Sequence, residues 1–168
     1  GDVIHLTEAE TTLVFENLGE RPYLSILRDF SAPVNLDFAQ SEADRLALAR
    51  LDPNLFNRWS VLNDLLGEAM VRACRAGGAA TASPLPAEIV DAVLVTAADP
   101  ALEPAFRAQA LALPAEPDVA RMLGRDVDPQ IVHDVVDAAR RAIGTAGVQV
   151  FERLAAEMAT VQAFSPDA

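Results

Sequence analysis

The chain has 168 residues, of which 51% are apolar, so it can bury a sizeable core in one or two compact domains. Its formal net charge of −12 disfavours binding to nucleic acid, because an acidic surface repels phosphate. The single cysteine cannot form an internal disulfide, and neither a signal pattern nor a ~20-residue apolar run is present, so we expect a cytoplasmic protein without a membrane partner.

The first 40 residues show a pattern that is typical of β structure. Runs rich in β-forming residues lie at 3–6, 11–17, 23–30 and 34–38. Pro33 lacks an N–H group, so we place it at a strand edge or a bulge. Three or four strands are too few for a complete sandwich. Residues 1–40 therefore predict a short antiparallel β segment whose open edges pair with another chain or a second copy.

From Ser41 onward the pattern changes to that of α-helices. Ser41 with Asp44 is an N-cap signal, and Asp52-Pro53 and Asp128-Pro129 predict further helix starts. The expected helices are 42–51, one from Pro53 to the Gly77-Gly78 break, 86–98, one from Glu103 through Leu113, 116–123, one from Pro129 to a break at Thr145 or Gly147, and a last one containing Val148 to Met158. Short turns between them favour antiparallel neighbours, although no strict repeat period indicates a regular solenoid. The fold class is α+β and mostly α, with an antiparallel helical array over 41–168.

The second helix has the clearest amphipathic pattern. Its apolar stripe, at spacings of three and four, is Leu55, Trp59, Leu62, Leu66, Met70 and Ala73. Trp59 is the only tryptophan, and its place on the stripe predicts packing in the core. In a less favoured interpretation, Arg58 is stacked or ion-paired and fixes the helix to the β segment.

No residue pattern indicates catalysis or metal binding. His5 and His133 lie in different elements, and the chain has neither an H-E-x-x-H motif nor a nucleotide-binding glycine motif. We expect His133 at the edge of a helical face and Cys74 buried, near a helix C-terminus that disfavours a thiolate. Arg140-Arg141 is expected in the last turn of its helix. The carboxylates fall mostly on polar helix faces, so we predict no catalytic, cofactor-binding or metal-binding residue.

Two stretches nevertheless resemble a known family. Thr12-Leu-Val-Phe-Glu-Asn and then Pro22-x-x-Ser25-x-Leu27-Arg28-x-Phe30-Ser31-Ala32-Pro33-Val34-x-Leu36 resemble the bacterial aminopeptidase N family of zinc metallopeptidases. The resemblance continues through Ser41 into Leu51-Asp52-x-x-x-Phe56-Asn57-Arg58-Trp59, and more loosely at 99–102, Leu113-Pro114 and Asp128-Pro129. One departure is Val61-Leu62-Asn63, where the family usually has Ala and Gln.

The resemblance implies the end of an Ig-like β-sandwich domain over 1–40, followed by the first portion of a helical C-terminal domain over 41–168. Family members bind zinc through H-E-x-x-H and a distant glutamate, and hold the substrate amino terminus with a G-x-M-E-N loop; neither motif occurs here. The chain therefore resembles a non-catalytic fragment that caps and shapes the peptide chamber of a zinc aminopeptidase.

In that interpretation the partner is the catalytic domain of the parent enzyme, and zinc and peptide substrates bind only in the parent. The alternative is a stand-alone helical module that binds a protein or peptide. Activity of the chain by itself is the least favoured hypothesis.

Overall fold

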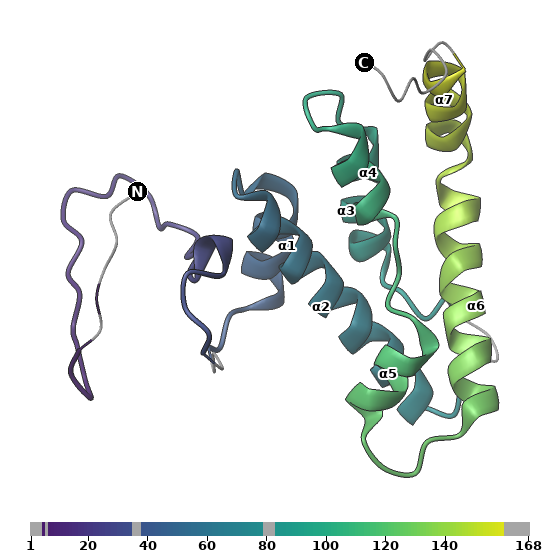
Figure 1. The fold of residues 1–168 in the computed structure, drawn as a ribbon, viewed down its shortest axis with the longest axis horizontal. Helices are drawn as coiled ribbons and strands as arrows, with labels where there is room; N and C mark the ends of the chain where they lie inside the picture. The colour runs from purple at the N-terminus through teal and green to yellow at the C-terminus, as the bar shows by residue number, and fades with distance from the viewer. Residues whose placement is uncertain (1–4, 6, 35–37, 79–82, 160–168) are drawn as a thin grey trace, which may run out of the picture.

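The computed structural model describes residues 5, 7–34, 38–78 and 83–159. In chain order its elements are η1 (Arg28–Phe30), a 3-10 turn, and the α-helices α1 (Glu42–Leu51), α2 (Leu55–Arg75), α3 (Ala87–Ala98), α4 (Pro104–Ala110), α5 (Glu116–Leu123), α6 (Pro129–Ala146) and α7 (Val148–Met158). Figure 1 shows α6 and α7 along one side of the array, with the N-terminal segment extending from the opposite side. The predicted helical array is confirmed.

The first two helices begin at different kinds of cap. The side chain of Ser41 accepts a hydrogen bond from the amide of Asp44, so α1 has the predicted bounds. The prediction that the second helix starts at Asp52-Pro53 is wrong. The side chain of Asn54 accepts from the amide of Asn57 at 3.0 Å and caps α2. Asp52 cannot serve as this cap because its carboxylate binds other groups.

Prolines mark the later helix starts, as predicted. Pro104, Pro117 and Pro129 lie in the first turns of α4, α5 and α6, where the missing N–H costs no hydrogen bond. Asp128 caps α6 through two amides of its first turn. Helix α4 ends at Ala110, before Leu113, where we expected it to continue, because Pro114 has no N–H for the carbonyl oxygen of Ala110 and its ring would clash with that oxygen in a continuous helix.

Gly147 separates α6 from α7, as predicted. A Cβ atom there would lie 2.6 Å from a side-chain carbon of Leu94, 2.6 Å from one of Phe151 and 2.9 Å from the backbone oxygen of Ile143, so a larger residue would force these groups to shift. The prediction that Arg140 and Arg141 lie in the last turn is wrong, because α6 continues to Ala146. Arg141 is instead ion-paired with a carboxylate one turn earlier.

The core is built around α2, which contacts α1, α3, α4, α5 and α6. The largest fully buried side chains of the core come from several helices and are Leu62, Leu65, Leu66, Met70, Ile89, Val93, Val119, Val135, Val136 and Thr96. The predicted stripe is correct in its C-terminal part, but Trp59 is only half-buried. Arg58, only 6% exposed, occupies the inner position at the start of α2, so the prediction of Trp59 in the core is wrong.

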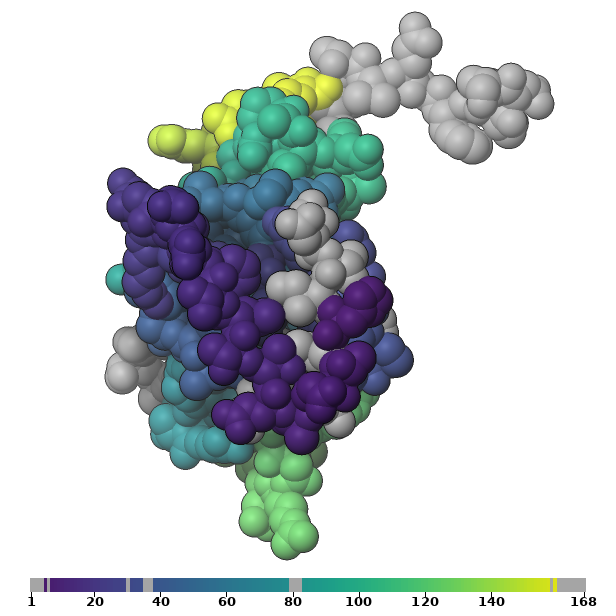
Figure 2. All heavy atoms as spheres, turned by 90° about the vertical axis from the view of Figure 1, so that its left-hand side faces the viewer, coloured from purple at the N-terminus to yellow at the C-terminus, as the bar shows by residue number. Residues whose placement is uncertain are grey.

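The predicted β segment is not seen in the described residues. Residues 11–17 carry no regular structure, and the run at 23–30 ends in the η1 turn. A strand needs a hydrogen-bonded neighbour, and no described backbone pairs with this segment. The runs at 3–6 and 34–38 lie largely outside the described residues. Figure 1 shows the N-terminal segment standing off from the helices, and Figure 2 shows its outer side in purple.

Candidate functional site

Polar side chains gather where the N-terminal segment meets α1 and α2. We call this set the junction network; its members are Ser25, Arg28, Asp29, Asp52, Asn54 and Asn57. At its centre Asp52, 3% exposed, accepts hydrogen bonds from the hydroxyl of Ser25 and from Arg28 Nη2 at 2.8 Å. The amide of Asn54 also donates to Asp52 at 2.8 Å. Three donors from two parts of the chain therefore satisfy one buried carboxylate.

Two asparagines bind the other side of the same turn. Asn57 is buried and donates from Nδ2 to the carbonyl oxygen of Ile26 at 2.8 Å and to the hydroxyl of Ser25 at 3.1 Å. Asn54 donates from Nδ2 to the carboxylate of Asp29 at 2.8 Å. Since these donors come from the first turn of α2 and its cap, the turn at 25–29 is held against the start of α2.

The backbone of this turn is strained. Leu27 has φ 54° and Asp29 has φ 55°, in the left-handed region that non-glycine residues rarely adopt. Each such residue costs of order 1 kcal/mol or more, and persists only when the surroundings fix it. The hydrogen bonds to Ser25, Ile26 and Asp29 supply that constraint.

The electrostatics of Asp52 follow from the same contacts. Burial by itself raises the pKa of this carboxyl, but hydrogen bonds from Ser25, Asn54 and Arg28 outweigh burial. The pKa of Asp52 therefore lies below its ordinary value, and the group is a carboxylate at neutral pH. Its three donors occupy its oxygens, so it is arranged for structural binding rather than for proton transfer.

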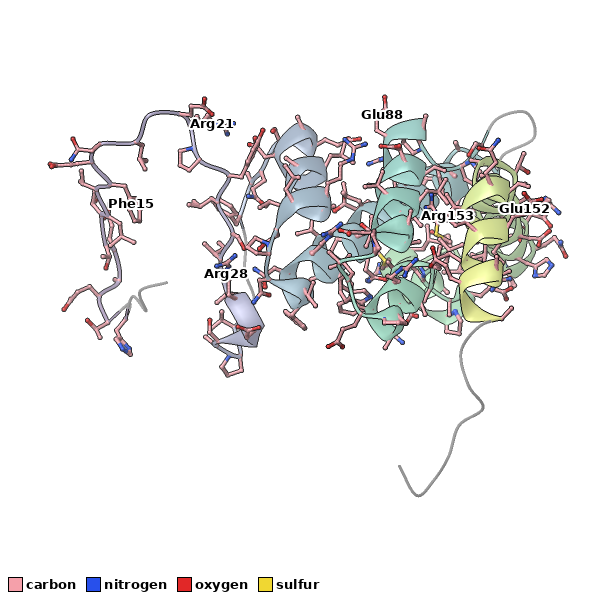
Figure 3. The ribbon with its side chains drawn as sticks, turned by 90° about the horizontal axis from the view of Figure 1, so that it is seen from above. Phe15, Arg21, Arg28, Glu88, Glu152 and Arg153 are labelled. Atoms are coloured by element: carbon pink, nitrogen blue, oxygen red, sulfur yellow. The ribbon has the colours of Figure 1, made fainter. Side chains whose placement is uncertain are left out.

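Two further contacts join the N-terminal segment to the helices. Arg21 forms a bidentate ion pair with Asp44, with distances of 2.8 and 2.6 Å. Gln40 donates from Nε2 to the carbonyl oxygen of Leu24 at 2.8 Å. Figure 3 shows Arg21 and Arg28 where the segment approaches the helices, whereas Phe15 lies farther out.

A cavity of about 540 Å³ opens beside the junction network. Residues 24–27 and 38–40 form one wall, and side chains of α1 and α2 form the other. Arg45 and Glu68 lie on the helical wall and make a bidentate pair at 2.8 and 2.9 Å. Phe56 lines the cavity too, and its ring centroid lies 6.2 Å from that of Trp59. The cavity therefore combines apolar surface with an ion pair whose charges satisfy each other.

Arg58 does not fix α2 to a β segment, so that interpretation is wrong. Its Nε donates to the carbonyl oxygen of Ala49 on α1 at 3.1 Å, and its Nη2 donates to the hydroxyl of Thr96 on α3 at 3.0 Å. Burial lowers the pKa of Arg58, while the charges of Asp99 and Asp52 raise it. Arg58 thus connects three helices through neutral acceptors.

The remaining candidates lie apart from the junction. Cys74 is buried, as predicted, and burial raises the pKa of its thiol. His133 lies exposed on α6, where Nδ1 is 2.9 Å from a carboxylate oxygen of Glu116, and it is not near His5 in any metal-binding set. Among the described residues no three His, Cys, Asp or Glu side chains form a group that could hold a metal ion.

The described helices also contain none that is long and apolar enough to cross a membrane. Ser25, Arg28, Asp52 and Asn57 lie within the two stretches that resemble a known family, but their sequence pattern predicts no role for them. The sequence does show these four polar residues beside apolar positions, two in each stretch. Nothing in the local sequence shows that the two stretches meet in the fold.

Two family descriptions match the chain. Residues 1–39 match DUF3458, a domain of unknown function with an Ig-like fold, and residues 42–168 match DUF3458_C, a domain of unknown function with ARM repeats. The Ig-like match agrees with the β pattern of the sequence, although no described residue there lies in a strand. The match over 42–168 indicates that the helices form ARM repeats, although the sequence has no strict repeat period.

Known proteins similar to the chain are aminopeptidases. It is 37% identical to aminopeptidase N of Caulobacter vibrioides over 99% of this chain and 19% of that protein, and 30% identical to aminopeptidase N of Escherichia coli over 85% and 16%. The crystal structure of Legionella pneumophila aminopeptidase A in complex with aspartic acid shares the fold, with a TM-score of 0.70 over 90% of this chain and 17% of that one at 24% identity.

The chain thus spans less than a fifth of the length of these relatives. The match over residues 42–168 covers most of the chain, and the relatives in sequence and in fold agree with it. The chain therefore belongs to the DUF3458_C family of ARM-repeat domains, and its sequence and fold fit a C-terminal part of aminopeptidase N.

Proposed function

We propose that the chain is a non-catalytic part of a zinc-dependent aminopeptidase that removes N-terminal amino acids from peptides. The observation that carries this proposal is the 37% identity to an aminopeptidase N over 99% of the chain. In the proposed enzyme the helical array caps and shapes the peptide chamber. The partner of the array is the catalytic domain, and peptide substrates bind only in the assembled enzyme.

The zinc of the proposed enzyme lies outside this chain. The described residues provide no metal-binding group, so they do not fit a zinc ion, and we assign them no step of peptide hydrolysis. Their proposed contribution is to position and enclose the peptide and to exclude water from the chamber. This contribution depends on a rigid array rather than on reactive side chains. The proposed location is the cytoplasm, because one buried cysteine suits a reducing compartment.

Two measurements test this proposal. The chain, purified in chelator and then supplied with zinc, is assayed with an aminoacyl chromogenic substrate; we expect no turnover, and zinc-dependent turnover would contradict the proposal. The complete parent is then compared with a form that lacks residues 42–168. We expect the deletion to change the dependence of kcat/KM on peptide length far more than turnover of the short chromogenic substrate. Equal effects on both would contradict a capping role.

A second candidate function is a stand-alone module that binds a peptide. The observation that favours it is the cavity of about 540 Å³ beside the junction network, which is within the size range of ligand pockets. Trp59 reports on this site because its ring centroid lies 6.2 Å from that of Phe56, which lines the cavity. Saturable quenching of Trp59 fluorescence by peptides, lost in Phe56→Ala, would favour this function. A flat titration would exclude it.

The N-terminal segment carries a separate proposal about partners. Leu13, Val14 and Phe15 are 46%, 77% and 61% exposed, in a stretch that no described residue pairs with. We propose that this segment pairs as a strand with a second copy when its natural neighbours are absent. Light scattering at high concentration should then show dimers that Val14→Lys abolishes. A monomer at all concentrations would contradict the proposal.

A further inference from the structure

The junction network unites the two sequence stretches that carry the family resemblance. Ser25 and Arg28 come from the first stretch, and Asp52 and Asn57 come from the second, yet all four lie in one set of hydrogen bonds. None of them approaches a metal-binding group in the described structure. Their hydrogen bonds therefore point to a mechanical role.

We propose that the junction network, together with the Arg21–Asp44 pair, fixes residues 21–29 onto α1 and α2 as one rigid unit, with Asp52 as its positioning residue. The two family matches divide at 39–42, but the contacts cross that division. The point about which the Ig-like part can move relative to the array then lies upstream of Arg21. Asp52 sets the direction in which the Ig-like part leaves the array.

The distribution of contacts supports this placement. From Arg21 onward, the segment is tied to the helices through Asp44, Asp52 and Asn57. Within the described residues, no hydrogen bond or ion pair joins 7–20 to a helix. The change between a segment without contacts to the helices and one with them therefore falls at residues 20–21, and the first bound backbone group is the carbonyl oxygen of Leu24.

Strain in the turn supports the same inference. Leu27 and Asp29 hold left-handed conformations that a free segment would leave. Asn57 binds the carbonyl oxygen before Leu27, and Asn54 binds the side chain of Asp29. Asn57 of α2 and its cap residue Asn54 thus hold the strained backbone at both of its ends. This is expected for a segment that moves with the array as one rigid body.

Limited trypsin digestion of the complete 168-residue chain tests the proposal. The chain has no lysine, and the bond between Arg28 and Asp29 lies inside the bound turn. Cleavage there requires the turn to open, whereas cleavage after Arg140 reports on α6 in the same digest. We expect Ser25→Ala and Asn57→Ala each to speed cleavage after Arg28 by about tenfold, because each removes part-buried hydrogen bonds that hold the turn. Cleavage after Arg140 should stay unchanged.

The matched control is Asp91→Asn, which removes the exposed pair between Arg50 and Asp91 and leaves the junction intact. It should leave cleavage after Arg28 at the wild-type rate. Unchanged cleavage after Arg28 in both Ser25→Ala and Asn57→Ala would overturn the proposal. Equal acceleration after Arg28 and Arg140 would also overturn it, since it would show general destabilisation.

Backbone 15N relaxation gives a second readout, first on the wild-type chain. We expect order parameters typical of a rigid backbone over 24–30 and lower values over 11–18, with the change near Arg21. Asp52→Asn should lower the order parameters over 24–30 and leave those of α3 and α6 unchanged. Equally low order parameters over both segments in the wild-type chain would overturn the proposal. Neither readout uses peptidase activity, so failure of the proposed function leaves this inference standing, and the reverse also holds.

Discussion

The Nε atom of Arg58 donates a hydrogen bond of 3.1 Å to the carbonyl oxygen of Ala49 in the last turn of α1. In a continuous helix this oxygen would accept from the amide of residue 53, but that residue is Pro53 and has no N–H. Arg58 therefore supplies from a neighbouring helix the donor that α1 lacks. Arg107 acts similarly, donating to the carbonyl oxygen of Ala97 in the last turn of α3 at 2.8 Å.

Replacing Arg58 should therefore be costly. In Arg58→Met the oxygen of Ala49 and the hydroxyl of Thr96 stay buried without this donor, so the free energy of unfolding should fall by about 2 kcal/mol. Urea unfolding followed by circular dichroism measures it. Arg141→Met, which removes an exposed pair on α6, is the control and should change stability by less than about 0.5 kcal/mol. Equal effects would contradict the capping role of Arg58.

The two glycines near the end of α6 should respond in opposite directions to alanine. A Cβ at Gly147 meets Leu94 and Phe151 at 2.6 Å, so Gly147→Ala should destabilise the chain by about 1–3 kcal/mol. Gly144 has open space around it within α6, so Gly144→Ala should stabilise by about 0.5–1 kcal/mol. Thermal unfolding of the two variants decides this; the same sign for both would show that the packing around Gly147 is wrong.

The contribution of Asp52 should depend on pH. Its folded-state pKa lies below the ordinary value of 3.8, so its stabilisation is complete above that pH and is lost as the pH falls through the folded pKa. At neutral pH Asp52→Asn should lower the free energy of unfolding by about 1–3 kcal/mol. The difference from wild type should shrink below about pH 4. Urea titrations from neutral pH to about pH 3 test this, and a difference that grows on acidification would contradict the assigned hydrogen bonds.

His133 should titrate above its ordinary value. Its pKa is raised by the hydrogen bond to Glu116 and by the charges of Glu116, Asp134 and Asp137. Proton NMR of the imidazole should show a pKa above 6.5 in the wild-type chain and a value closer to 6.5 in Glu116→Gln. A pKa that does not respond to this substitution would show that the pair does not form in solution. Any stability from the pair is present at low pH and is lost as the pH rises through the folded pKa.

The helices could be predicted from sequence because their signals are local. Ser41, Pro104 and Asp128 each lie within a few residues of the helix start they determine, and no distant part of the chain is needed. The start of α2 was mispredicted because Asp52 is an equally good local cap, but a distant segment binds its carboxylate. Local preference thus shows that Asp52 can cap a helix, but it does not show that Ser25 and Arg28 bind the Asp52 carboxylate instead.

The β segment and the junction network could not be predicted in the same way. The pattern at 11–17 indicates that this segment can form a β-strand when a neighbouring strand pairs with it. Such pairing depends on residues far away in sequence. Ser25 and Asp52 are 27 positions apart, and no periodicity connects them. Trp59 shows the same limit, since the stripe predicts a core position for it but does not reveal that Arg58 takes the inner position.

The central position of α2 has a consequence for synthesis of the chain. Its C-terminal half buries Met70 and Val71, and the helices that cover it include α5 and α6, which begin only at Glu116 and Pro129. A chain leaving the ribosome therefore exposes this apolar half until those later helices have emerged. During that interval the growing chain presents exposed apolar surface, so the array closes its core late in translation.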